Sequence, residues 1–332
     1  MRYPLSLNAS MTTYLVKQRL AGRTRYPIVL MLEPTELCNV ACEGCGRIRE
    51  YEATIKERLS VEECLAAVDA CGAPIVSICG GEPLIYRDIV PLVEGVVARK
   101  KHVYLCTNAL LMQRTMPKLK PSPYFNWAVH LDGMEATHDR ILNRKGTFRI
   151  AIEAIKAAKA AGFRVCTNTT VFKDTDPDEV LELMRFLKGL GVDGNLISPA
   201  FEYTVLKGVD IFDTREVIRE KFRRIAPHAD EFPLENTPLY MEFLEGKREY
   251  RCTPWGNVTF TPSGWKGPCY LITDAHYKTF EELMARTDWD KYENRRDDRC
   301  RNCMAHCSVE PTVVREMALT DLPKMIRWQL TA

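Results

Sequence analysis

Apolar runs of strand length alternate with helical stretches through residues 28–198, and this alternation limits the folds that the chain can adopt. Strands joined by helical crossovers lie parallel in one sheet, so the pattern predicts the α/β class. Ser60 and Glu63 form a capping box at the start of the first long helix of this region. The alternation alone does not separate a partial barrel from a doubly wound open sheet. The expected strands are 28–33, 75–79, 103–107, 127–132, 164–171 and 194–198, and the expected helices are 60–71, 89–100, 148–161 and 177–190.

The composition describes a chain with a large core and no strongly charged surface. Hydrophobic residues make up 46% of the 332 residues, which is enough for one large domain with an appendage. The net charge is only +2 and the two signs are interspersed, which argues against nucleic-acid binding. No apolar run approaches the ~18 residues of a membrane span, and residues 1–10 lack the apolar region of a signal peptide. We therefore expect a cytoplasmic protein.

Three of the thirteen cysteines stand close together directly after the first expected strand. Without a secretion signal, so many cysteines indicate metal ligation in a reducing compartment rather than disulfides. Cys38, Cys42 and Cys45 form a CxxxCxxC triplet, whose thiolates can hold three corners of a [4Fe–4S] cluster and leave the fourth iron open to a small molecule. A chance grouping and part of a zinc site are the alternatives. A second motif, Gly80-Gly81-Glu82-Pro83, follows the second expected strand.

The two motifs, each at the carboxyl end of a strand, resemble those of the radical SAM superfamily. This resemblance implies a partial (β/α)6 barrel of the TIM type, in which S-adenosylmethionine (SAM) chelates the open iron and is cleaved reductively to a 5′-deoxyadenosyl radical. It also implies that Gly80, Gly81 and Glu82 hold the methionine amino group. The electron would come from an external donor such as flavodoxin or ferredoxin.

Alternation along the strands predicts which side chains face the barrel lumen. Cys106, His130, Asp132 and Asn168 lie on the strand faces that do not carry the large apolar residues, near the carboxyl ends where barrel sites form. The resemblance implies a SAM ribose contact for Asn168, and it matches Asp132 to an S-x-D-G segment with His130 at the serine position. In the alternative interpretation His130 is a hydrogen-bonded core residue and Cys106, like Cys166, is a small buried hydrophobe.

One position departs from the superfamily pattern. The residue before the third cysteine of the triplet is commonly aromatic and touches the adenine of SAM, whereas this chain has Gly44. The resemblance therefore leaves the adenine to another contact, for which we consider the backbone near residues 196–199.

Five further cysteines gather in the last third of the chain and resemble the cysteine-rich SPASM/twitch extensions of radical SAM enzymes. They are too few for the two clusters of a full SPASM domain, so we expect one metal site at most, held by four of the five. An auxiliary [4Fe–4S] cluster, a zinc ion and no metal are the alternatives. The chain then divides into an N-terminal helical cap over 1–25, the barrel over 26–235 and the cysteine-rich extension over 236–332. The five cysteines are Cys252, Cys269, Cys300, Cys303 and Cys307.

Longer segments narrow the resemblance to the adenosyl-hopene transferases, the radical SAM enzymes of C35 hopanoid biosynthesis. That resemblance implies a transferase that adds the 5′-deoxyadenosyl radical to the terminal alkene of diploptene, an apolar triterpene, and so forms adenosylhopane. We expect Cys106 to be catalytic and to donate a hydrogen atom to the resulting carbon radical, with Tyr104 as the competing donor. The segments are 14–20, 103–111, 122–125, 130–133, 138–140 and 250–256.

Two other functions stay open from the sequence. A SPASM/twitch-type radical SAM enzyme would modify a peptide or another substrate by hydrogen abstraction, and a non-enzymatic iron–sulfur scaffold or sensor would not need a SAM site. For a diploptene enzyme we expect an apolar pocket, with candidate residues at 124–127 and 201–203. Residues 11–20 are either a barrel-capping helix or a segment that rests on the inner face of the membrane.

Overall fold

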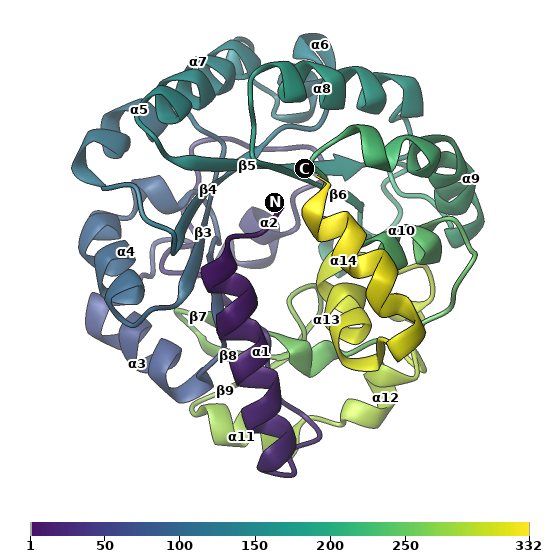
Figure 1. Ribbon diagram of the computed structural model, residues 1–332. Coiled ribbons are helices and arrows are strands. Elements are labelled where there is room, and N and C mark those ends of the chain that lie inside the picture. The colour runs from purple at the N-terminus through teal and green to yellow at the C-terminus, as the bar shows by residue number, and fades with distance from the viewer. Residues whose placement is uncertain (1, 332) are drawn as a thin grey trace.

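The computed structural model describes residues 2–331 and contains one sheet of nine strands. The strands are β1 (Val29–Leu32), β2 (Ile75–Ile78), β3 (His102–Thr107), β4 (Phe125–His130), β5 (Arg164–Val171), β6 (Gly194–Pro199), β7 (Asn257–Thr261), β8 (Gly264–Pro268) and β9 (Thr273–Tyr277). Strands β1 to β6 are parallel, lie in chain order and form an open barrel (Figure 1). Next to β1 the sheet continues with the parallel strand β7 and the antiparallel strands β8 and β9. The predicted partial barrel with a C-terminal extension is therefore confirmed.

Helices cover the outside of the barrel, and the four predicted crossover helices are present (Figure 1). The predicted capping box is also present, because Ser60 Oγ accepts the N–H of Glu63 at 3.1 Å and Glu63 accepts the N–H of Ser60 at 2.7 Å. The helices are α1 (Leu5–Leu20), α2 (Arg47–Glu50), α3 (Val61–Cys71), α4 (Ile89–Ala98), α5 (Met112–Thr115), α6 (Glu135–Ile141), α7 (Thr147–Ala160), α8 (Pro177–Gly189), α9 (Arg215–Ile225), α10 (Pro238–Leu244), α11 (Phe280–Arg286), α12 (Trp289–Glu293), α13 (His306–Glu316) and α14 (Leu322–Leu330).

Each barrel strand has one face toward the helices and one toward the lumen. Val103 and Leu105 of β3, and Trp127 and Val129 of β4, are fully buried in the main hydrophobic core. The alternate residues on these strands belong to the lumen side, as the period-2 pattern predicts. Large aliphatic and aromatic side chains thus bind the helices to the sheet, and the smaller and polar residues are left for the interior.

Both ends of the chain cross the end of the barrel at which the strands begin (Figure 1). On α1, the Tyr14 hydroxyl donates to the carbonyl oxygen of Pro27 at 2.6 Å, and Ser10 Oγ lies 3.4 Å from the ring Nε2 of His102. This places α1 opposite the carboxyl-end loops, where barrel sites are built. Within residues 2–331 no helix is both long enough and apolar enough to cross a membrane.

The aromatic segment 124–127, which we considered as a lipid-binding loop, is part of the core instead. Strand β4 begins at Phe125, two residues earlier than expected. The rings of Phe125 and Trp127 are 1% and 0% exposed and meet edge to face at 5.2 Å. Aromatic residues favour strands, so they extend β4 rather than form a loop. This part of the pocket prediction is wrong.

Candidate active site

The loop after β1 holds the cysteine triplet at the carboxyl end of the barrel. Cys38, Cys42 and Cys45 are each half-buried, and the N–H of Cys45 donates to the carbonyl oxygen of Cys42 at 3.2 Å. Burial raises the pKa of the Cys38 thiol to about 11, and the charges of Glu82 and Cys45 act in the same direction. Burial also raises the pKa of Cys42, with added effects from Cys45 and Asp132. Neighbouring thiols of this kind deprotonate readily only when cations lie among them, which fits a shared iron–sulfur cluster.

Gly80 and Gly81 pack the second motif against the segment that leads into the triplet. A Cβ on Gly81 would lie 2.2 Å from the carbonyl oxygen of Leu37, and Gly80 has a φ of +108°, which other residues rarely adopt. The N–H groups of Gly81 and Glu82 donate to the carbonyl oxygens of Thr35 and Leu37 at 3.1 and 2.8 Å. Because these N–H groups are used, we expect the carbonyl oxygens of this turn to meet the amino group of SAM.

The side chain of Glu82 fixes this turn to the end of β3. It is 1% exposed, and it accepts the N–H of Leu84 at 3.0 Å, the N–H of Asn108 at 2.8 Å and the hydroxyl of Thr107 at 2.8 Å. Burial raises the pKa of the carboxyl, although the three hydrogen bonds oppose the shift. We therefore assign the SAM contact predicted for Glu82 to its backbone rather than to its carboxylate.

His130, Asp132 and Asn168 come together at the carboxyl ends of β4 and β5. His130 is paired with Asn168 in the strand register, and its Nε2 lies 2.6 Å from Asp132 Oδ2. Burial alone would lower the pKa of His130, but the Asp132 carboxylate raises it above its usual value. The second oxygen of Asp132 accepts the N–H of Thr170 at 2.8 Å. We therefore expect Asp132, itself 1% exposed, to act on SAM through the orientation of His130.

Aromatic rings from later in the chain fill the space beside the glycines of the triplet. A Cβ on Gly44 would lie 2.3 Å from the ring of Phe172, and a Cβ on Gly46 would lie 2.2 Å from the ring of Tyr203. Phe172 directly follows β5 and is 8% exposed. The ring of Phe172 thus lies beside Gly44, the position where other radical SAM proteins commonly have an aromatic residue. No pattern in the sequence predicted this contact. Phe172 is a stronger candidate for the adenine contact than the backbone near residues 196–199.

Small residues form the middle layer of the barrel strands. The register places Cys106, Ala128, Cys166 and Gly194 next to one another across β3 to β6. Glu235 packs against Gly194, where a Cβ would lie 2.6 Å from its Cγ. TIM barrels usually fill such layers with bulky branched side chains. This layer is thus built of small side chains, with the buried carboxyl of Glu235 beside Gly194.

Cys106 carries a thiol in this layer. Its Sγ lies 3.3 Å from Ser77 Oγ, and burial raises its pKa to about 11, so the sulfur keeps its hydrogen at neutral pH. Tyr104 lies two residues nearer the start of β3, which puts it about 7 Å further from the SAM end at ~3.3 Å per residue. Cys166 is buried and donates to the carbonyl oxygen of Trp127 at 3.3 Å. The geometry thus favours Cys106 over Tyr104 as a donor to a radical near SAM.

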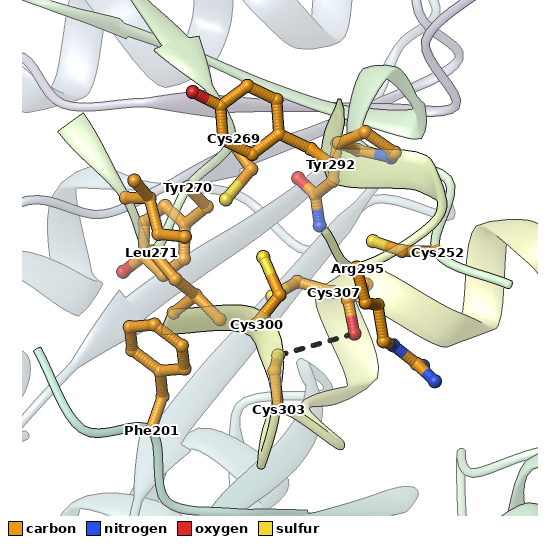
Figure 2. A pocket seen from close by; sticks show the side chains of 14 residues that line it. Phe201, Cys252, Cys269, Tyr270, Leu271, Tyr292, Arg295, Cys300, Cys303 and Cys307 are labelled. Carbon is orange, nitrogen blue, oxygen red and sulfur yellow. Dashed lines mark hydrogen bonds between the residues drawn. The ribbon is translucent and has the colours of Figure 1, made fainter. Parts of the chain in front are cut away.

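The five tail cysteines line one cavity, to which separate segments contribute (Figure 2). The cavity has a volume of about 30 Å³, and aromatic and aliphatic side chains such as Phe201 and Leu271 form much of the remaining wall. Burial raises the pKa of Cys300 to about 12, with added effects from Cys303 and Cys269. Within residues 2–331 no three His, Cys, Asp or Glu side chains converge as the ligands of one ion would. The cavity brings the five cysteines together, and a metal site held by four of them stays a prediction.

A buried ionic network connects the triplet loop with the tail, and sequence reasoning missed it. Arg47 is 4% exposed, contacts Glu33 at 3.0 Å and donates to the carbonyl oxygen of Tyr270 at 2.5 Å. Lys266 of β8 donates to the same carbonyl at 3.0 Å and contacts Glu50 at 3.3 Å. Tyr270 also lines the tail cavity. The network thus fixes the two cysteine sites relative to each other.

Residues 201–203, the second candidate for the lipid pocket, lie between these two sites. Phe201 lines the tail cavity, and its ring meets that of Tyr203 edge to face at 5.4 Å. Tyr203 in turn packs on Gly46, next to the triplet. Both rings therefore fill space between the cysteine sites, and a role in binding a lipid is not needed to explain them.

The amino-acid sequence of this chain is similar to two protein families and to several known enzymes. Residues 32–187 match the model of the radical SAM superfamily, and residues 195–327 match a domain of unknown function, DUF3463. GTP 3′,8-cyclase from Aquifex aeolicus is 28% identical over 198 residues, which cover 57% of this chain and 61% of that enzyme. GTP 3′,8-cyclase from Aliarcobacter butzleri is 24% identical over 263 residues, which cover 74% of this chain and 81% of that enzyme.

Solved structures share the fold. SuiB from Streptococcus suis, bound to the precursor peptide SuiA, gives a TM-score of 0.63 at 17% identity over 87% of this chain and 69% of SuiB. Native anSMEcpe with bound AdoMet and Kp18Cys peptide gives a TM-score of 0.59 at 14% identity over 91% of this chain and 98% of that protein. At these identities the likeness establishes the fold alone.

A partial barrel with a cysteine triplet and a glycine-rich turn at its carboxyl end defines a class of iron–sulfur enzymes that use SAM. The sequence match over the barrel agrees with this class. Residues 32–187 thus form a radical SAM domain, and the cofactors typical of that superfamily are a [4Fe–4S] cluster and SAM.

Proposed function

We propose that this protein is an adenosyl transferase that joins the 5′-deoxyadenosyl group of SAM to the terminal alkene of diploptene, giving adenosylhopane. The sequence resemblance described above suggests this substrate. The structural observation that carries the proposal is the thiol of Cys106, which keeps its hydrogen and belongs to a barrel layer of small residues. Radical addition to an alkene needs such a hydrogen donor, whereas abstraction from a substrate does not.

The proposed reaction forms one carbon–carbon bond and one carbon–hydrogen bond. A reduced cluster, when bound, would give one electron to SAM, whose C5′–S bond would break to release methionine and the 5′-deoxyadenosyl radical. Addition of this radical to the terminal methylene leaves a tertiary carbon radical, and the S–H bond of Cys106 breaks to give that carbon its hydrogen. Because a thiol S–H bond is weaker than the C–H bond formed, the transfer runs downhill. The sulfur radical left on Cys106 returns to a thiol with one electron from the external donor and one proton from solvent.

The small middle layer suits a substrate without polar groups. Diploptene has no hydrogen-bonding group, so its affinity must come from buried apolar area, at ~25 cal/mol per Å². The neighbouring positions Ala128 and Gly194 carry no polar side chain, and the carboxyl of Glu235 beside Gly194 is the polar group next to this layer. A bulky ring system could therefore lie below SAM with its alkene near the Cys106 thiol.

Side chains at the carboxyl end of the barrel are proposed to hold the cofactors. Cys38, Cys42 and Cys45 would bind the cluster, and Phe172 would pack on the adenine. The carbonyl oxygens of Gly80 and Gly81 would accept hydrogen bonds from the methionine amino group, while His130 and Asn168 would contact the carboxylate or the ribose. Neutral hydrogen bonds of this kind contribute ~0.5–1.5 kcal/mol each.

The tail cavity is proposed to hold an auxiliary [4Fe–4S] cluster through four of its five cysteines. Its walls combine thiols with apolar side chains, as a cluster shielded from water requires. The cavity also supports the main alternative function, a SPASM/twitch-type enzyme that modifies a peptide or another substrate by hydrogen abstraction. Such an enzyme would release 5′-deoxyadenosine rather than build it into its product.

A substrate comparison separates these functions. The reconstituted protein is incubated anaerobically with SAM and a reductant, and with either diploptene, GTP or an unrelated peptide. Mass spectrometry should find an adenosylated lipid with diploptene and no product with the other two. The Cys38→Ala, Cys42→Ala, Cys45→Ala triple variant is the control and should form neither lipid product nor 5′-deoxyadenosine. A modified peptide or cyclised GTP, with diploptene unchanged, would contradict the proposal.

A further inference from the structure

The helices α1 and α14 both cross the end of the barrel where the strands begin, which we call the lower end (Figure 1). Both helices lie in the foreground of this view. Their ends are joined, because the N–H of Arg2 donates to the carbonyl oxygen of Gln329 at 3.1 Å and the rings of Tyr3 and Trp328 meet at 5.4 Å. The guanidinium of Arg2 also donates to the carbonyl oxygen of Trp328 at 2.8 Å. We call the exposed side of these two helices the lower face.

The lower face carries large apolar side chains in contact with solvent. On α14, Leu322, Ile326 and Leu330 recur at every fourth residue and are 36%, 56% and 64% exposed. Residues at this spacing share one side of a helix. Leu319, just before α14, is 83% exposed, and α1 adds Leu5, Val16 and Leu20, which are 69%, 50% and 85% exposed. Large apolar side chains exposed in this number at one end of a molecule favour an interaction site.

The charges around these side chains are mainly positive. Neither α1 nor α14 contains an Asp or Glu, and the first acidic residue of the whole chain is Glu33. The loops before β3 and β4, which lie at the same end of the barrel, contribute further lysines. Acidic residues near this end are paired with basic ones: Asp69 with Arg99, Glu242 with Lys324, Asp290 with Arg25 and Asp321 with Arg248. The further basic residues of this end, which these pairs do not use, are Lys17, Arg19, Arg23, Lys100, Lys101, Lys118, Lys120 and Arg327.

We propose that the lower face docks the protein on an anionic lipid surface. Helices that lie in a membrane interface combine an apolar side with Lys and Arg, and anionic headgroups attract such basic residues. A second copy of this chain is a poorer occupant, because two copies of the same face would bring like charges together. The inference does not depend on which substrate the barrel takes, and it goes beyond the proposed reaction. Docking in this way keeps the carboxyl end of the barrel in water, where an electron donor reaches it.

Vesicle binding tests the proposal. The full chain is sedimented with vesicles of phosphatidylglycerol and phosphatidylcholine, and separately with vesicles of phosphatidylcholine alone. Binding to the anionic vesicles is expected, with weaker binding to the neutral ones and a loss at high salt. The Leu322→Ser, Ile326→Ser, Leu330→Ser triple variant should bind the anionic vesicles at least about tenfold more weakly. It lacks three aliphatic side chains that the native chain would bury in the lipid interface. A matched control is Ile150→Ser on α7, which is 41% exposed, away from the lower face, and should bind like the native chain.

Two further readouts separate the possible outcomes. The triple variant should keep the native melting temperature, since its three side chains are exposed, and it should keep native SAM cleavage. If the native chain fails to bind anionic vesicles, or the triple variant binds them as well as the native chain does, the proposal is overturned. A native dimer that the triple variant loses, without vesicle binding, would assign the face to a second copy instead. Product formation from detergent-dispersed diploptene tests the proposed reaction separately.

Discussion

Replacing Cys106 by alanine removes the proposed hydrogen donor without touching the cysteine triplet or the glycine-rich turn. We expect Cys106→Ala to cleave SAM but to lose the saturated adenosylhopane, or to deliver hydrogen with altered facial selectivity. Liquid chromatography with mass spectrometry of the lipid extract measures the product. Cys166→Ala is the matched control, because its thiol lies in the same layer but donates to the carbonyl oxygen of Trp127. Adenosylhopane made by Cys106→Ala at the native rate and configuration would make Cys106 a packing residue.

The ring of Phe172 gives a second prediction at the scale of residues. If this ring packs on the adenine, Phe172→Ala should weaken SAM binding about two- to tenfold, the loss of one aromatic contact worth ~0.5–1.5 kcal/mol. Calorimetry on the anaerobically reconstituted protein measures the dissociation constant of SAM. Phe186→Ala on α8, where the ring is 36% exposed, is the control and should leave it unchanged. Native affinity for SAM in Phe172→Ala would return the adenine contact to the backbone near residues 196–199.

Between elements, Glu310 of α13 fixes the start of α10 and makes this junction sensitive to pH. Its carboxylate accepts the N–H and the hydroxyl of Thr237, both at 2.9 Å. Burial raises the pKa of Glu310 from its usual 4.5 to about 7. At pH values between 4.5 and about 7, Glu310 therefore keeps its proton in the folded protein and releases it in the unfolded chain. The stability contributed by this group is therefore complete below about pH 4.5 and is lost as the pH rises through 7.

We accordingly expect Glu310→Gln, measured by urea unfolding, to gain free energy of unfolding relative to the native chain as the pH rises from about 5 to about 8. The glutamine oxygen can accept the N–H of Thr237 and its amide group can donate to the Thr237 hydroxyl, but it carries no charge. Glu153→Gln, on the exposed side of α7, should show no such change with pH. An equal difference between Glu310→Gln and the native chain at both pH values would show that this carboxyl titrates normally.

The predicted strands and crossover helices of residues 28–198 lie within a few residues of the observed ones, because the apolar periodicity of each is local. Strand β5 has the predicted bounds, 164–171, and the capping box of α3 is present. Contacts between distant segments could not be predicted. The parallel pairing of β1 with β7 joins Val29 to Asn257, and the bond from Arg47 to Tyr270 joins residues 223 positions apart. The contact between Phe172 and Gly44 could not be predicted either, because no local sequence pattern shows which distant ring packs on a glycine.

The whole molecule holds two cysteine sites linked by a buried network, and this arrangement predicts two separate clusters. The Cys38→Ala, Cys42→Ala, Cys45→Ala variant should keep iron and sulfide in the proportions of one [4Fe–4S] cluster, bound in the tail. Iron, zinc and sulfide analysis with electron paramagnetic resonance measures this. A further exchange of Cys269→Ala and Cys303→Ala should remove the remaining iron, whereas Cys64→Ala, buried in α3, should not. Zinc without sulfide would identify the tail as a structural zinc site, and a metal-free variant would remove the auxiliary cluster from this account.

The most direct measurement of the central claim follows the adenosyl group itself. The reconstituted protein is given diploptene and SAM with ¹³C throughout its adenosyl group, and the label is located by mass spectrometry. Radical addition predicts that the label appears in the lipid product, in proportion to the SAM consumed. Label found only in free 5′-deoxyadenosine, while substrate is consumed, would contradict this account and identify a hydrogen-abstracting enzyme.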